Sequence, residues 1–153
     1  MAFPFTKDHP DIDADADEDW WLDDGNLEGL VSIEEGGELL RLHSVELKDP
    51  ALARKRTGAG RRSMEALRPL FRTIVADGAI HPFAGSPEDE APMLFWTAML
   101  RDGLIDEMYL ANSGTRFTPE DLGRPVETDL GLTVTLGRDG TFSCEPPAPS
   151  PGR

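Results

Sequence analysis

The chain has 153 residues, of which 39% are hydrophobic, enough for one modest core and too little for two. No stretch is apolar over the roughly 20 residues that a membrane helix needs, so we expect no membrane association. Its single cysteine, Cys144, excludes an internal disulfide framework, and Met1–Lys7 does not resemble a secretory signal, so a cytoplasmic location is predicted.

Charge is distributed unevenly along the chain, whose formal net charge is -14. Residues 8–38 contain thirteen acidic residues and no Lys or Arg, whereas residues 41–72 contain nine Lys or Arg and three acids. A short basic stretch favours a small anion over a nucleic-acid backbone, which needs a broad basic face. We therefore expect no nucleic-acid partner. An open alternative is that the acidic segment neutralises the basic one.

Acidic residues near the N-terminus alternate with other residues. Aspartate occupies every second position at Asp11, Asp13, Asp15, Asp17 and Asp19. A calcium-binding loop would need Gly at the sixth position from Asp11, where Ala16 stands, and Glu at the twelfth, where Leu22 stands. We therefore expect residues 1–19 to form a disordered acidic arm, residues 20–144 a single domain, and the proline-rich residues 145–153 a disordered tail.

Two alternating runs, residues 27–35 and 39–47, predict a β-hairpin in which Gly36 and Gly37 supply the positive φ angles of a tight turn. Side chains alternate along a strand. We expect the second strand to present Leu40, Leu42, Ser44 and Glu46 on one face, and Leu39, Arg41, His43, Val45 and Leu47 on the other. Pro50 ends that strand.

A basic loop punctuated by glycines follows Pro50. It consists of Lys55, Arg56, Thr57, Gly58, Ala59, Gly60, Arg61 and Arg62. Two glycines two positions apart let the backbone approach a ligand closely, and a helix that begins there presents free N–H groups to an anion. These eight residues are therefore predicted to bind a phosphorylated cofactor.

Apolar residues recur at helical spacing from Met64 to Val75, but Pro69 interrupts them. Proline removes a backbone hydrogen bond, so either the helix kinks or a first helix ends near Leu67 and a second begins with Pro69 in its first turn. Gly78 closes this unit. Beyond it we expect a short strand at residues 79–84.

The rest of the chain predicts a strongly apolar helix at 88–101, a strand at 104–111, and a short helix capped by Thr118 with Pro119 in its first turn. A C-terminal hairpin at 130–136 and 141–144 follows. Together, the elements predict an α+β fold with a mixed, mostly antiparallel β-sheet flanked by helices.

The order of strand, proline, basic glycine loop, helix, strand and apolar helix resembles the GNAT N-acetyltransferase superfamily. That family's signature is Arg/Gln-x-x-Gly-x-Gly/Ala, and Lys55, Gly58 and Gly60 fall on its three fixed positions. Residues 90–104 look like the family's late helix. The resemblance covers about residues 39–107 and implies a GNAT-like fold, in which two strands splay apart to admit the pantetheine of acetyl-CoA.

The resemblance also implies acetyl transfer from acetyl-CoA to an amine on a small molecule or a basic protein. Glu46 is the first candidate for the general base, with His43 and His81 as alternatives. The tyrosine that commonly protonates the departing thiolate is replaced by Trp96, and Tyr109, the single tyrosine, is a candidate substitute.

Other hypotheses about the function are also consistent with the sequence. The chain is alternatively a non-catalytic GNAT-like module that binds CoA or a partner, or an acidic interaction protein that acts through residues 1–19. The acidic arm could also fold over Lys55–Arg62 and compete with the coenzyme. A homodimer is left open. No metal site is expected, because the three histidines lie far apart in the sequence.

Overall fold

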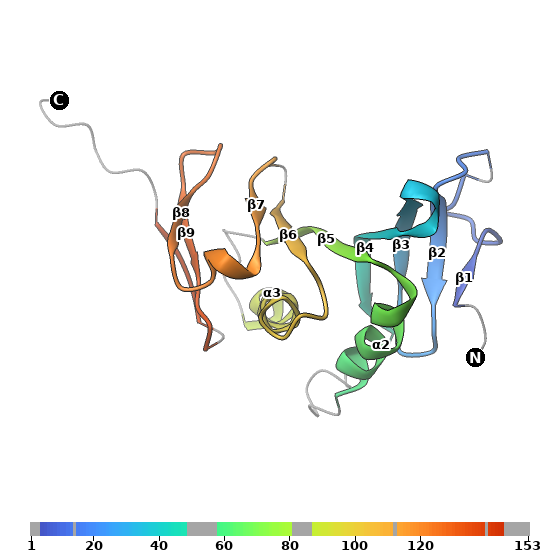
Figure 1. The fold of residues 1–153 in the computed structure, drawn as a ribbon, viewed down its shortest axis with the longest axis horizontal. Helices are drawn as coiled ribbons and strands as arrows, with labels where there is room; N and C mark the ends of the chain where they lie inside the picture. Colours follow the sequence, from blue (N-terminus) through green and yellow to red (C-terminus); the bar gives the residue numbers. More distant parts are fainter. Residues whose placement is uncertain are drawn as a thin grey trace, which may run out of the picture.

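The computed structural model describes residues 4–13, 15–48, 58–80, 87–111, 113–139 and 141–145, without the side chains at 79, 80 and 87–92. It has an α+β fold with a seven-stranded mixed sheet, a three-stranded sheet and two α-helices (Figure 1). The predicted fold class, a mixed and mostly antiparallel sheet with flanking helices, is confirmed.

The large sheet is assembled in chain order. Its strands are β1 (Phe5–Thr6), β2 (Asp19–Asp23), β3 (Leu27–Glu34), β4 (Leu39–Leu47), β5 (Thr73–Ile80), β6 (Glu107–Leu110) and β7 (Arg116–Phe117). Strands β1 to β4 are antiparallel, β4 to β6 are parallel, and β7 is antiparallel to β6.

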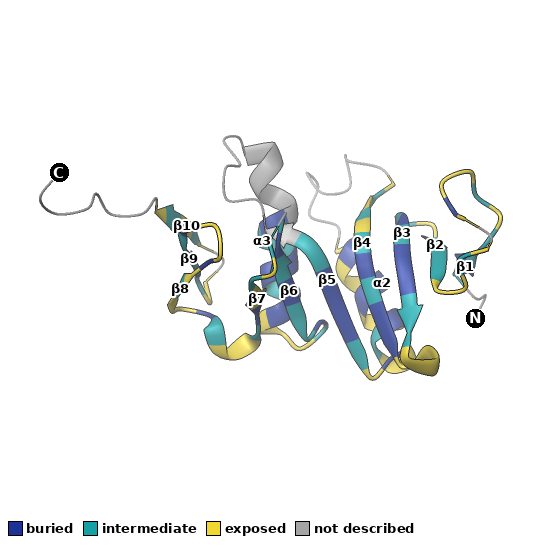
Figure 2. Ribbon diagram, turned by 90° about the horizontal axis from the view of Figure 1, so that it is seen from above, coloured by how far each residue is buried: buried dark blue, intermediate teal, exposed yellow. Residues whose placement is uncertain are grey.

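Parallel neighbours need a crossover connection, and a helix supplies each one here. Helix α2 (Ala59–Leu67) lies between β4 and β5, and α3 (Pro87–Arg101) lies between β5 and β6. Both helices lie on the same face of the sheet (Figures 1 and 2), as two successive crossovers of one hand require.

A three-stranded antiparallel sheet ends the described chain. It consists of β8 (Pro125–Glu127), β9 (Thr133–Leu136) and β10 (Phe142–Glu145) in the order β10-β9-β8. Val134 and Leu136 of β9 belong to the main core, so the two sheets pack together. The short helix before it, Pro119–Asp121, has the predicted cap at Thr118.

The two helices bury one face of the large sheet. Fully buried side chains on the core side include Leu22, Leu40, Ile74, Met108, Met64, Met93 and Leu100. No helix of the described residues covers the opposite face, which we call the open face (Figure 2). Strand alternation and register place Trp21, Ser32, His43, Asp77 and Tyr109 there, one from each of β2 to β6.

A β-bulge in β4 changes which side chains share a face. Ser44 pairs with Leu30 and Leu42 pairs with Val31, which leaves His43 as the extra residue. An extra residue reverses the alternation beyond it. The core side of β4 therefore carries Leu40, Leu42, Val45 and Leu47, and the open face carries Arg41, His43, Ser44 and Glu46. The prediction that Ser44 and Glu46 share a face with Leu40 was wrong.

Helix α2 and strand β5 divide a segment that the sequence predicted to be helical through Val75. The helix ends at Leu67, a 3-10 turn at Arg68–Leu70 contains Pro69, and β5 begins at Thr73. The second of the two predicted alternatives is correct, because Pro69 cannot donate the next helical hydrogen bond. The predicted strand at 79–84 begins earlier, at Thr73, and residues 81–86 lie outside the described part.

The predicted acidic arm has a defined structure over its described residues. Phe5 and Thr6 of β1 pair with β2. The ammonium of Lys7 donates to the carbonyl oxygens of Ala16 and Asp17 at 2.7 and 3.0 Å, and lies 4.6 Å from the centre of the Trp20 ring. One cation thus closes an acidic loop onto the sheet, which differs from the disordered arm we expected.

Candidate functional site

Strands β4 and β5 are paired over only part of their length. The ladder joins Leu39–Leu42 to Thr73–Ala76 and contains no pair beyond the bulge at His43. Figure 2 shows the two strands diverging from that point toward the end of β4 at which α2 begins. We call this unpaired stretch of the two strands the β4–β5 seam. Parallel strands that separate in this way leave backbone groups available to a ligand.

Helix α2 begins beside the wide end of the seam. Gly58 precedes it in the left-handed conformation, with a φ of 76°, and no described side chain caps the helix. The Arg62 guanidinium lies 3.5 Å from the position that a Cβ of Gly58 would take. The positive end of the helix dipole and a guanidinium therefore lie on the same side, an arrangement that favours an anion.

Gly60 has a packing role in addition to any ligand role. A Cβ at this position would lie 3.0 Å from the Phe95 ring of α3 and 3.6 Å from Leu47 of β4. Glycine therefore lets α2 approach both elements closely. Phe95 packs edge-on against Trp96, which is 6% exposed. The two aromatic residues of α3 belong to the core wall beside the seam.

Arg61 is engaged by a carboxylate at the end of α3. Its guanidinium lies 2.7 Å from Asp102, which also accepts a hydrogen bond from Arg101 at 2.9 Å. Arg101 first, and then Arg61, hold the pKa of Asp102 well below its usual range. Of the predicted cofactor residues, Gly58, Ala59, Gly60, Arg61 and Arg62 lie together at the helix start. Lys55, Arg56 and Thr57 lie outside the described residues.

A buried hydroxyl lies on the core side of α2. Ser63 is 3% exposed, and its Oγ has no hydrogen-bond partner among the described residues. It follows Gly60 by three positions, so both residues are on the same side of the helix. A buried hydroxyl without a partner costs about 1–3 kcal/mol.

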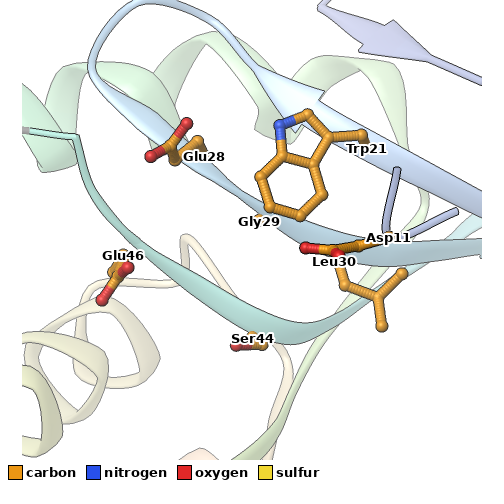
Figure 3. Close-up of a pocket in the computed structure, with 7 residues that line it drawn as sticks. All are labelled: Asp11, Trp21, Glu28, Gly29, Leu30, Ser44 and Glu46. Atoms are coloured by element: carbon orange, nitrogen blue, oxygen red, sulfur yellow. The ribbon is translucent and has the colours of Figure 1, made fainter. Parts of the chain in front are cut away.

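A cavity of about 410 Å³ opens on the other side of the sheet. Its lining, drawn in Figure 3, consists of Asp11, Trp21, Glu28, Gly29, Leu30, Ser44 and Glu46. Glu28 and Glu46 are direct cross-strand partners, and like charges in that position repel. The lining contains no Lys or Arg, so its three carboxylates favour a cation. The Trp21 ring forms one wall, and one face of this ring is stacked on the His9 imidazole, with 3.6 Å between the ring centroids.

Three polar side chains from adjacent strands lie beside this cavity on the open face. Ser32 Oγ is 2.6 Å from His43 Nε2, and His43 Nδ1 is 3.4 Å from Asp77 Oδ2. Of these three residues, only His43 was a candidate from the sequence, as an alternative general base; Ser32 and Asp77 were not predicted. Strand register, which no motif in the chain specifies, brings them together.

The predicted catalytic residues lie apart from one another. Glu46 lines the cavity on β4, whereas Tyr109 lies on the open face of β6, beyond β5. Burial alone would lower the pKa of Arg41, but its hydrogen bond to Glu34 and the charges of Glu34, Asp77 and Tyr109 together raise it. The side chain of His81 lies outside the described residues.

Two features are absent from the described ranges. No three or more His, Cys, Asp or Glu side chains there are grouped as metal ligands would be. Neither described helix is long and apolar enough to cross a membrane. Comparisons of the chain with protein-family models, with curated proteins and with solved structures found no match.

Proposed function

We propose that the chain is a GNAT-type N-acetyltransferase, which moves an acetyl group from acetyl-CoA to an amine. The observation that carries the proposal is the β4–β5 seam, with the start of α2 at its wide end. An extended chain of amides can pair with separated strands, while its diphosphate binds at a helix N-terminus. These are the two requirements that the pantetheine diphosphate of CoA makes of a protein.

The residues at the seam fit that coenzyme in part. The diphosphate is assigned to the backbone N–H groups at Gly58–Gly60 and to Arg62, with Lys55 and Arg56 as further cations. Arg61 fits less well, because Asp102 already engages it. When bound, the coenzyme supplies an acetyl group activated as a thioester.

The open face supplies the acceptor side of the proposal. The cavity around Glu28 and Glu46 attracts an ammonium group, and Trp21 packs against its methylenes. Glu46 is proposed to take the proton that the ammonium must lose before attack. Tyr109 lies on β6, across β5 from Glu46, and its role as the acid that protonates the departing thiolate stays a prediction.

Titration calorimetry with acetyl-CoA tests the coenzyme site. Arg62→Glu should weaken binding at least tenfold, because it places a negative charge beside the helix start. Arg124→Glu, an exposed position before β8, changes the net charge equally and should bind as the native chain does. Absence of binding to the native chain would end the proposal.

Thiol release with a panel of amines tests transfer. Glu46→Gln should reduce kcat by about 10²-fold or more if Glu46 is the base. A second candidate, a module that binds CoA without transfer, is favoured by the position of Trp96. This residue replaces the family's acidic tyrosine and is buried in the core. Binding without turnover on any amine would support that second function.

A further inference from the structure

The arrangement of the Ser32, His43 and Asp77 side chains is that of an activated nucleophile. A hydroxyl lies within hydrogen-bond reach of one imidazole nitrogen, at 2.6 Å, and a carboxylate lies 3.4 Å from the other nitrogen. This order of nucleophile, base and orienting acid recurs on unrelated folds and is recognised by geometry rather than by sequence. Each residue is on a different strand, so the sheet itself fixes their relative positions.

Burial distinguishes the three members. Ser32 is 6% exposed, whereas the side chains of His43 and Asp77 are 30% and 41% exposed. The hydroxyl is therefore held against His43, and the imidazole remains accessible to a substrate and to water.

The charged groups around Ser32 also suit this chemistry. Its direct cross-strand neighbours are Asp19 on β2 and Arg41 on β4. Arg41 donates to Glu34 at 2.9 Å, which holds the guanidinium in an ion pair on the strand next to Ser32. A fixed cation at this point stabilises negative charge that develops on a carbonyl oxygen.

We propose that Ser32, His43 and Asp77 form a serine esterase centre for small carboxylic esters that carry an ammonium group. The adjoining cavity selects the ammonium. Leu30, which lines it, is two residues from Ser32 on the same face of β3, and Ser44 directly follows His43. Glu46 supplies a carboxylate for the cation, and the Trp21 ring, which stacks on His9 through one face, borders the same space.

The reaction balances without a cofactor. As Ser32 Oγ bonds to the ester carbonyl carbon, its proton passes to His43 Nε2, and the alcohol leaves with that proton. Water then attacks the acyl-serine and gives a proton to His43 Nε2, which returns it to Ser32 Oγ as the carboxylic acid departs. Asp77 keeps the imidazole oriented through Nδ1. The net change is ester and water to acid and alcohol.

This inference does not rest on the proposed acetyltransferase. The serine centre is on the open face and needs no coenzyme, whereas the CoA site is tested by calorimetry at the start of α2. Ester chemistry can therefore fail while CoA binding succeeds, and the reverse.

Covalent labelling of the full chain tests the centre directly. A fluorophosphonate probe should add once to the native chain, and peptide mapping should place the label on Ser32. His43→Gln should abolish labelling. Ser143→Ala removes an exposed hydroxyl on β10, away from the cavity, and should label as the native chain does. No label, or a label on a residue other than Ser32, would overturn the proposal.

Hydrolysis of acetylthiocholine, without coenzyme present, tests the substrate class. Ser32→Ala should lower kcat/KM by about 10²-fold or more, with an unchanged circular dichroism spectrum. The uncharged isostere 3,3-dimethylbutyl thioacetate should react at least tenfold more slowly than the cationic substrate. Equal rates for both substrates, or for Ser32→Ala and the native chain, would contradict the assignment.

Discussion

Replacing Gly29 with alanine tests the bulge that places Ser44 and Glu46 on the open face. Gly29 has a φ of 156° and pairs with Val45. A Cβ at Gly29 would overlap the carbonyl oxygen of Ser44 and lie 2.7 Å from the Cα of Val45. Because both are backbone atoms, no side-chain rotation relieves the overlap, and β3 and β4 must separate or change register.

The size of the effect follows from that geometry. Backbone strain of this kind costs about 1–3 kcal/mol, and each ladder hydrogen bond lost beside it adds about 1 kcal/mol. We therefore expect Gly29→Ala to lower the free energy of unfolding by about 3–5 kcal/mol. Gly25 is a matched control, because its φ is also positive, at 93°, but a Cβ there meets nothing within 4 Å. Gly25→Ala should cost only about 1 kcal/mol.

Urea unfolding followed by tryptophan fluorescence measures the difference. With a denaturant dependence of about 2 kcal/mol per M, Gly29→Ala should lower the midpoint by about 1.5–2.5 M and Gly25→Ala by about 0.5 M. Equal midpoints for the two variants would refute the reasoning, because they would show that Ser44 and Val45 do not constrain Gly29.

Three further predictions concern charged groups. Lys7→Met should destabilise the chain by about 1–2 kcal/mol and increase amide exchange at residues 15–19, because Lys7 binds the carbonyl oxygens of Ala16 and Asp17 in this loop, and unchanged exchange would contradict this. Asp102→Asn should cost about 0.5–1 kcal/mol near neutral pH. The folded-state pKa of Asp102 lies below its ordinary 3.8. The stability that the carboxylate contributes is therefore present above that pH and is lost as the pH falls further. Urea titrations should show the free energies of unfolding of the native chain and of Asp102→Asn converging in acid. Glu46→Gln should raise stability at low salt by about 0.3 kcal/mol by relieving repulsion from Glu28, whereas Glu120→Gln should not.

The elements found from the sequence are those with strong local signals. The Gly36-Gly37 turn fixed the hairpin, the apolar spacing fixed α3, and Thr118-Pro119 fixed a helix start. Their signals are short-range, so no knowledge of the rest of the fold was needed.

The errors arose where distant residues decide the structure. The apolar spacing of α2 continued into β5 by coincidence, and only Pro69 marked the boundary. The bulge at His43 is a feature of the pairing of β4 with β3, so the faces of β4 could not be read from β4 alone. Order near the N-terminus depends on Lys7, whose carbonyl partners are nine or more residues away.

The candidate site residues also divide into those with a local sequence signal and those that distant residues bring together. The glycine loop was predicted from its local chemistry and stays a prediction as a cofactor site, and Gly60 packs against Phe95. Ser32 and Asp77 were missed because register alone brings them to His43.

A titration of the isotope-labelled chain with acetyl-CoA, followed by amide NMR, tests whether the coenzyme binds at the start of α2 and along the β4–β5 seam. We expect saturable changes in amide chemical shift at Gly58–Ser63 and along β4 beyond His43, where the strand leaves β5. Shifts confined to other parts of the chain, or no shifts at millimolar coenzyme, would contradict it.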